Sequence, residues 1–235
     1  MSWRGASQPD VGVVIVAAGA GVRAGPGAPK QFRPILGVPM LLRALRPFTS
    51  HPAVGPVVVA LPPGVAARPP EWLAALAGER LALVAGGASR ALSVRAGLRA
   101  LPAHVALVLV HDGARPFVSH ATIDAVIARA RGGVGAVAAV PLSDTVKEVA
   151  EAPRIARTVA REGLWRALTP QGFPRAMLER AYASLAPDEP APTDDAALCE
   201  RAGFPVEVVP DSSDNLKVTT ADDFRIAEAL ARDGR

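Results

Sequence analysis

The sequence predicts an α/β fold, a single domain with a mostly parallel, twisted, Rossmann-like sheet and helices on both faces. Short apolar runs rich in β-branched residues alternate with helical patterns, as a parallel sheet covered by helices requires. The length of 235 residues suits one α/β domain, and no interdomain linker, repeat or low-complexity tract interrupts the chain. We therefore expect residues 1–235 to form one domain.

Hydrophobic periodicity and the positions of proline and glycine locate the expected elements. Buried strands are expected at residues 11–17, 56–61, 81–85, 105–111 and 134–140. Helices are expected at residues 39–49, 71–77, 89–101, 120–130, 175–185, 194–202 and 221–231.

Residues 141–161 break this alternation. The segment carries more charge, a proline at position 153 and two short β-prone pieces, TVKEVA and RIARTVA. These features predict a β-hairpin that projects from the main body as an arm.

Composition excludes several classes of protein. No apolar run approaches the ~20 residues that cross a bilayer, and the N-terminal segment lacks the apolar region of a signal peptide. A single cysteine, Cys199, rules out an intramolecular disulfide and a cysteine-rich metal site. Aromatic residues are only 4% of the chain, which does not favour nucleic-acid binding. We expect a cytoplasmic protein without membrane or nucleic-acid partners.

Charge is unevenly distributed along the chain. Residues 11–70 contain no Asp or Glu, while the same stretch carries the cations Arg23, Lys30, Arg33, Arg43, Arg46 and Arg68. A positive N-terminal third predicts an anionic ligand.

The first expected strand runs directly into a glycine-rich turn, GVVIVAAGAGVR at residues 12–23. Gly19, Gly21 and Ala24 satisfy the dinucleotide-binding pattern G-x-G-x-x-G/A. Prolines in the following GPGAPK prevent the helix that this motif needs, and no acidic residue follows at the ribose-binding position. A Walker A loop is excluded because no GK[ST] is present. An ordinary strand-to-helix turn is the remaining structural alternative.

A long phosphate-binding loop explains the segment best. Glycines allow the backbone to approach a phosphate closely, and Arg23 and Lys30 place two cations at the end of the loop. Two such charges can neutralise a triphosphate and its transition state.

The pattern AAGxGxR–x6–K resembles the signature loop of sugar-phosphate nucleotidyltransferases. Together with GGASRALSV, HDGARP, DTVK and TPQ, it resembles the 2-C-methyl-D-erythritol 4-phosphate cytidylyltransferase family from about residue 11 to residue 224. The resemblance implies transfer of CMP from CTP to that polyol phosphate in isoprenoid precursor biosynthesis. It makes Arg23 and Lys30 catalytic, and Ala17, Ala18, Gly19 and Gly21 nucleotide-binding.

Further roles come from the same resemblance. GGASRALSV (86–94) would enclose the cytosine through Gly86, Gly87 and Ser93, although Ala88 stands where the family usually has an acidic residue. Ser89 alone would be an ordinary helix cap.

A magnesium ion is expected at Asp112, which closes the strand before GARP, because Mg²⁺ prefers carboxylate and phosphate oxygens. His111 is expected to be structural. By resemblance, Asp214 adds a second carboxylate on the metal side and Lys217 lies near the substrate phosphate.

The acceptor side and the oligomeric state are also implied by the resemblance. The 141–161 arm would exchange between the subunits of a homodimer, with Thr145 and Arg161 positioning the acceptor phosphate. Arg115 and Thr169 are assigned to the substrate site, and TPQ (169–171) is expected to be a proline-containing loop. Trp165 and Phe173 are expected in the core or the dimer interface. Thr193 is expected first to cap a helix, with the two acidic residues after it favourably placed in the first turn, and a role in the substrate site comes second.

Three alternatives stay open. Ribitol 5-phosphate cytidylyltransferases share most of these motifs and differ in the acceptor. An NADP-dependent reductase would use the first glycine loop for a dinucleotide. A catalytically silent nucleotide-binding regulator is disfavoured by the retained loop cations and acidic residues.

Overall fold

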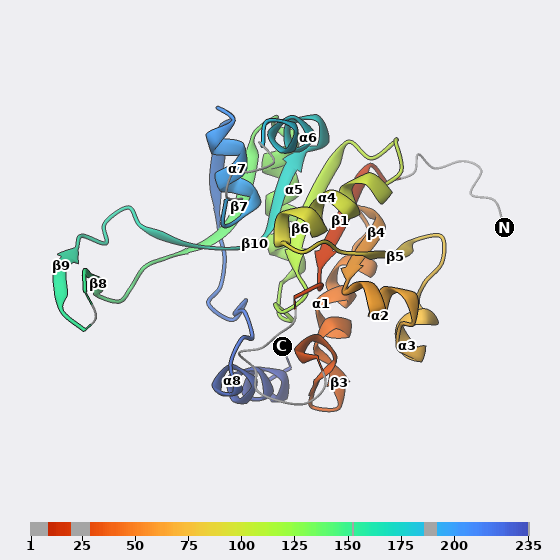
Figure 1. Cartoon of the computed structure of the whole chain (residues 1–235), viewed down its shortest axis with the longest axis horizontal. Helices are drawn as coiled ribbons and strands as arrows, with labels where there is room; N and C mark the ends of the chain where they lie inside the picture. The colour runs from red at the N-terminus through yellow and green to blue at the C-terminus, as the bar shows by residue number, and fades with distance from the viewer. Residues whose placement is uncertain (1–8, 20–28, 152, 186–191, 235) are drawn as a thin grey trace.

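A computed structural model of the chain describes residues 9–19, 29–151, 153–185 and 192–234 (Figure 1). Within these residues the core is a seven-stranded sheet in the order β11-β7-β10-β6-β1-β4-β5. The strands of this sheet are β1 (Val11–Val16), β4 (Val54–Leu61), β5 (Leu81–Ala85), β6 (Leu107–Asp112), β7 (Gly135–Pro141), β10 (Trp165–Pro174) and β11 (Val206–Pro210).

The sheet is mostly parallel, as the sequence predicts. β1 pairs in parallel with β4 and β6, β4 with β5, and β11 with β7, whereas β10 runs antiparallel to both β6 and β7. The chain passes from β1 outward to β4 and β5, and then returns to place β6 on the other side of β1. Such a reversal of strand order is where open α/β sheets bind their ligands, beyond the carboxyl ends of the strands.

Helices cover both faces because residues alternate in direction along each strand. On one face Val13 and Ile15 of β1 pack with α1 (Met40–Thr49) and α5 (His120–Arg131). On the other face Val14 packs with α4 (Arg90–Ala100), and this cluster continues to α6 (Arg175–Ala183) and α7 (Asp195–Arg201).

A smaller cluster lies beside the main core. The short strands β2 (Pro34–Ile35) and β3 (Val38–Pro39) pair with each other, and Ile35 packs with Val218 and with Ala227 of α8 (Ala221–Arg232). This packing brings the C-terminal segment next to the segment that follows the first glycine loop. The remaining short elements are η2 (Lys30–Phe32), α2 (Pro63–Ala67) and α3 (Glu71–Ala74).

The hairpin expected at residues 141–161 is present. β8 (Val146–Val149) pairs antiparallel with β9 (Ile155–Val159), and Figure 1 shows this ribbon extended away from the rest of the molecule. Side chains along the hairpin are mostly exposed, including Val149 at 51% and Ile155 at 55%, so the arm has no cover from the body of its own chain.

The sequence analysis was wrong to expect a loop at residues 169–171, which lie inside strand β10, and it did not identify strand β11 at residues 206–210. Pro170 and its neighbours, expected in a loop, lie inside β10 between two central strands. The pairing of β10 with β7 shifts between Ala167 and Gln171, and the missing N–H of Pro170 falls within this irregularity. Phe173 is fully buried in the core, whereas Trp165 is 38% exposed.

Among the residues that the structure describes, no helix combines the length and the apolar character needed to cross a bilayer.

Gly97 provides a test of the packing between α4 and β1. A Cβ atom at this position would lie 2.4 Å from Cγ1 of Val14, a stiff β-branched side chain in the sheet. We expect Gly97→Ala to lower the free energy of unfolding by about 1–2 kcal/mol, because overpacking outweighs the better helix propensity of alanine. Thermal unfolding measures this loss, because each kcal/mol lowers the melting temperature by about 2–4 °C.

The matched control is Gly64→Ala in α2, where an added Cβ meets nothing within 4 Å. This variant should unfold at or slightly above the wild-type temperature. Equal melting temperatures for the two variants would contradict the close contact between α4 and β1.

Candidate functional site

A cavity of about 570 Å³ opens at the carboxyl ends of β1 and β6, at the reversal of strand order. The register pairs Val16 of β1 with Asp112 of β6, so both strands end at the floor of this cavity. Its lining comprises Val16, Ala17, Ala18, Gly19, Lys30, Gln31, Gly87, Ala88, Ser89, Arg90, Ser93, Asp112, Gly113, Ala114, Lys217 and Thr219. Segments far apart in sequence therefore form one site.

The first wall follows β1. The buried Gln31 donates from Nε2 to the carbonyl oxygen of Ala17 at 3.0 Å, which fixes the chain where β1 ends. Lys30 lines the cavity and donates from Nζ to the carbonyl oxygen of Val218 at 3.0 Å. Gly21 and Arg23, which the sequence analysis assigned to this wall, lie outside the described residues.

The second wall is the turn from β5 into α4. A Cβ at Gly86 would lie 2.5 Å from Cβ of Ala18, and one at Gly87 would lie 2.3 Å from Cβ of Leu92. Gly86 is therefore required by close packing of the two walls, and Gly87 by close packing against the first turn of α4. The hydroxyl of Ser93 accepts from the N–H of Gly87 at 3.1 Å and donates to the carbonyl oxygen of Ser89 at 2.9 Å. This turn holds polar backbone at the edge of the cavity.

Asp112 is surrounded by cations. Its Oδ2 lies 2.8 Å from Nζ of Lys217 and 3.8 Å from Nε of Arg115, and its Oδ1 lies 3.4 Å from Nε of Arg90. Burial by itself raises the pKa of Asp112, but Arg90, Lys217 and Arg115 outweigh it and hold the pKa well below the ordinary value. The carboxylate is therefore charged in the folded protein.

Polar groups behind Asp112 fix its backbone. The Asp112 N–H donates to Oγ1 of Thr169 at 3.1 Å, and Thr169 Oγ1 lies 3.0 Å from Nδ1 of the buried His111. His111 Nε2 lies 3.0 Å from the carbonyl oxygen of Arg115, which can only accept, so Nε2 carries the proton and the Thr169 hydroxyl donates to Nδ1. His111 is thus a neutral structural residue, as expected.

Arg115 connects this layer to the C-terminal segment. Its Nη1 donates to the carbonyl oxygen of Asn215 at 2.7 Å, and Asn215 Nδ2 donates to the carbonyl oxygen of Thr169 at 2.8 Å. Burial lowers the pKa of Arg115, although Asp112 acts in the opposite direction. These contacts place Lys217 beside Asp112.

The comparisons with known proteins agree with this geometry. The model of the family described as 2-C-methyl-D-erythritol 4-phosphate cytidylyltransferase (IspD) matches residues 11–233. The chain belongs to this family. Its match to the model covers the whole cavity, from Val16 at the end of β1 to Thr219.

Individual relatives show the same extent of similarity. The chain is 45% identical over 219 residues to the 2-C-methyl-D-erythritol 4-phosphate cytidylyltransferase of Salinibacter ruber, covering 93% of this chain and 91% of the relative. It is 46% identical over 236 residues to the enzyme of that name from Streptomyces coelicolor, covering 96% of this chain and 86% of the relative.

A solved structure shares the fold. The crystal structure of 2-C-methyl-D-erythritol 4-phosphate cytidylyltransferase from Thermus thermophilus matches with a TM-score of 0.80 and 37% identity, covering 95% of this chain and 99% of that chain. Family membership removes the reductase alternative for the first glycine loop.

The cavity brings together most of the site residues that the family resemblance implies. Those that line it are Ala17, Ala18, Gly19, Lys30, Gly87, Ser93, Asp112 and Lys217. Gly86 packs against this wall, and Arg115 and Thr169 support the floor from behind.

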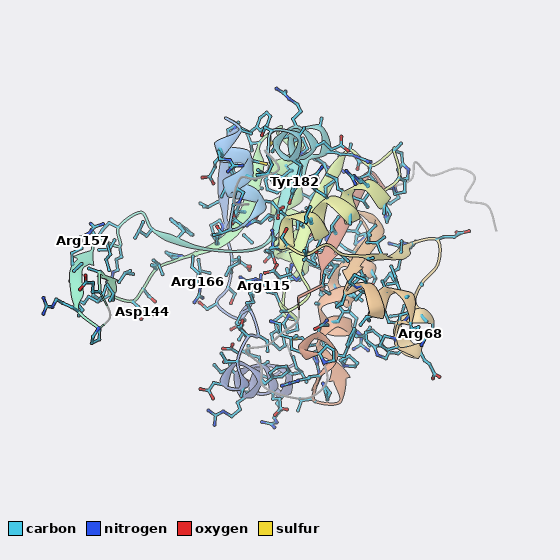
Figure 2. The ribbon with its side chains drawn as sticks, in the orientation of Figure 1. Arg68, Arg115, Asp144, Arg157, Arg166 and Tyr182 are labelled. Carbon is cyan, nitrogen blue, oxygen red and sulfur yellow. The ribbon has the colours of Figure 1, made fainter. Side chains whose placement is uncertain are left out.

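Three of the residues that the resemblance implies, Asp214, Thr145 and Arg161, lie elsewhere in the same chain. Asp214 lines a different cavity, of about 520 Å³, between the root of the arm and α8. Thr145 and Arg161 are exposed on the arm, and Arg161 Nη1 donates to the carbonyl oxygen of Ser143. Figure 2 shows Asp144 and Arg157 far out along the arm, and Arg166 closer to the body.

The sequence analysis missed Arg90. It lines the cavity and forms ion pairs with Asp112 and with Asp195, its Nη1 lying 2.6 Å from Oδ2 of Asp195. A cation three residues after the double glycine was the available signal. The cap of α7 is Asp194, which accepts from the N–H of Ala197, and not Thr193 as expected. Asp195 is buried against Arg90 and Tyr182.

The side chains available as metal ligands restrict how a metal ion can bind in the cavity. Among the described residues, no group of three or more His, Cys, Asp and Glu side chains could hold a metal, and Asp112 is the carboxylate that lines the 570 Å³ cavity. A divalent cation here would need further oxygens from a bound ligand, which is how Mg²⁺ is held in many phosphate-binding sites.

His111 makes stability depend on pH. Burial lowers its pKa to about 4, so the neutral ring is favoured in the folded state, while the unfolded chain takes up a proton near pH 6.5. The contribution of the neutral His111 ring to the free energy of unfolding is fully present above pH 6.5 and is lost as the pH falls through about 4. Between these pH values the free energy of unfolding falls by about 1.4 kcal/mol per pH unit.

Urea unfolding at several pH values between 7 and 4 measures this slope. We expect His111→Gln to lose that part of the pH dependence, whereas His104→Gln, at an exposed histidine, keeps it. An unchanged slope in His111→Gln would contradict the assignment of a neutral, buried ring.

Proposed function

We propose that this chain transfers CMP from CTP to 2-C-methyl-D-erythritol 4-phosphate and releases pyrophosphate, supplying a precursor for isoprenoid biosynthesis. The observation that carries the proposal is a cavity at the switch point of a family-typical fold, with cations from separate segments around one ionised carboxylate. A polyanionic nucleotide fits such a site.

The two walls of the cavity would bind different parts of the nucleotide. Gly19 and Lys30 belong to the wall that would hold the triphosphate, with Arg23 completing it by the family pattern. Gly87 and Ser93 belong to the wall that would hold the cytosine, where recognition would come mainly from backbone groups. The departure at Ala88, which also lines the cavity, removes a carboxylate from this wall.

The chemistry requires positioning and charge stabilisation. An oxygen of the acceptor phosphate attacks the α-phosphorus of CTP in line, a new P–O bond forms, and the bond to the bridging α–β oxygen breaks. The electron pair leaves with pyrophosphate. The attacking phosphate oxygen is already anionic, so no general base is needed. Lys30 and Arg23 would stabilise the charge on the α-phosphate and the leaving group.

Asp112 would hold a magnesium ion together with phosphate oxygens of CTP. The ionised carboxylate and the phosphate-accessible cavity fit this mode, in which the protein supplies one or two carboxylates. When bound, the ion neutralises phosphate charge. Asp214 lines the other cavity and is not in the proposed ligand set.

We propose that the acceptor phosphate is positioned by a second copy of the chain. Thr145 and Arg161 lie on an exposed arm, and Arg161 presents a guanidinium suited to bidentate contact with a phosphate. In a homodimer the arm of one subunit would reach the cavity of the other, beside Lys217. Because CTP is available in the cytoplasm, we place the reaction there.

The activity is tested by pyrophosphate release with CTP, Mg²⁺ and a panel of polyol phosphates. We expect turnover with 2-C-methyl-D-erythritol 4-phosphate and little with ribitol 5-phosphate, and a preference for CTP over other nucleoside triphosphates. Turnover with ribitol 5-phosphate alone would move the assignment to the ribitol-specific alternative.

Mixed dimers test whether the arm acts on the partner's site. Lys30→Ala and Arg161→Ala should each lower the rate by about 10²–10³, as loss of a transition-state contact does. In an equimolar mixture, half of the dimers would be mixed and each would contain one intact composite site. We expect recovery to about a quarter of the wild-type rate, as the arithmetic of random pairing gives.

The control is a mixture of Lys30→Ala with Lys217→Ala, two residues that line the same cavity within one chain. This pair should stay at the low rate whichever chain the arm serves, because every subunit in the mixture keeps a defective cavity. Once native mass spectrometry has shown that subunits exchange, failure of the Lys30→Ala and Arg161→Ala mixture to recover would refute delivery in trans.

A further inference from the structure

Arg90 is shared unequally between two buried carboxylates. Its Nη1 lies 2.6 Å from Oδ2 of Asp195, but its Nε lies 3.4 Å from Oδ1 of Asp112. Side-chain exposure is 25% for Arg90, 0% for Asp195 and 9% for Asp112. The short contact is therefore the one made away from the floor of the cavity, with α7.

Asp195 is fixed from several directions. Its Oδ1 accepts from the hydroxyl of the buried Tyr182 at 2.6 Å, and its backbone N–H donates to Oε1 of Gln171 at 3.1 Å. The carboxylate has one strong donor on each oxygen, so it holds Arg90 in a defined place.

The guanidinium has an unused donor. Arg90 Nη2 is buried and has no hydrogen-bond partner within the described part of the chain. A buried donor without a partner is costly, and an arginine gains most from a bidentate contact with a carboxylate. Movement toward Asp112 would provide that contact, and the bond to Asp195 opposes the movement.

We propose that Asp195 is a positioning residue, which holds Arg90 back so that the carboxylate of Asp112 stays available to the ligand. This inference rests on the proposed function, in which Asp112 meets the metal–nucleotide complex. Without the Asp195 charge, Arg90 would close on Asp112 with two parallel N–H···O bonds. Asp112 would then be neutralised from within the protein.

Asp195→Asn tests the proposal because it keeps the shape of the side chain and removes only its charge. Calorimetric titration without acceptor should show MgCTP binding weakened about tenfold, while binding of CTP in the absence of metal is unchanged or tighter. The reason is that an anionic Asp112 attracts the metal complex and repels free triphosphate. A merely structural role would weaken both ligands alike, and that result would overturn the proposal.

Two variants separate positioning from folding. Tyr182→Phe removes a hydrogen bond to Asp195 but leaves its charge, so it should lower the melting temperature without changing the ratio of MgCTP to CTP affinity. Glu200→Gln, at an exposed acid on the same helix, should change neither quantity. A changed ratio in Tyr182→Phe equal to that of Asp195→Asn would count against a role for the Asp195 charge.

A double-mutant cycle tests whether Asp195 acts through Arg90. In an Arg90→Gln background, adding Asp195→Asn should leave the affinity ratio unchanged, because no guanidinium remains to close on Asp112. An undiminished effect of Asp195→Asn in that background would contradict the proposed route.

A crystal structure of the Asp195→Asn variant tests the positioning role of Asp195 independently of the proposed metal role of Asp112. We expect both contacts between Arg90 and Asp112 at about 2.7–2.9 Å, in place of the single contact of 3.4 Å. If wild-type protein showed no preference for MgCTP, the metal role of Asp112 would fail, and this structure would still decide the proposal about Asp195. An Arg90 that stays 3.4 Å from Asp112 in the variant would refute it.

Discussion

The charge of Asp112 is the constraint on which the site depends. A buried carboxylate is unfavourable unless cations or hydrogen bonds compensate for the lost water. Here the compensation comes from Arg90, Arg115 and Lys217, which belong to three different segments of the chain. Each cation is directed at the carboxyl end of β6, so a single charge organises the first α4 turn, the loop after β6 and the C-terminal segment.

The support of this charge extends well beyond the cavity. Thr169 joins the Asp112 backbone to His111, and Asn215 joins Thr169 to the C-terminal segment. On the other side, Arg90 leads to Asp195 and α7. The centre around Asp112 is therefore held by β10, the C-terminal segment, α4 and α7, which gives the fixed geometry that the proposed catalysis by positioning would require.

The division between body and arm has a physical cause. The core strands bury their apolar residues under helices on both faces, whereas the β8–β9 ribbon leaves apolar residues such as Ile155 exposed. An exposed two-stranded ribbon is marginally stable alone. Contact with a second chain would cover it, which agrees with the proposed delivery of Arg161 to a neighbouring cavity.

The sequence by itself determined the parallel core, the projecting hairpin and several of the residues that line the 570 Å³ cavity, because hydrophobic period, glycines and prolines are local signals. It also gave Lys30 and Asp112, which follow buried strands. Only the tertiary structure decided that residues 165–174 form a central strand, since their partners come from β6 and β7 and Pro170 concealed the pattern. Likewise only the fold paired Arg90 with Asp195, 105 residues away, because an ion pair between distant segments leaves no periodic trace.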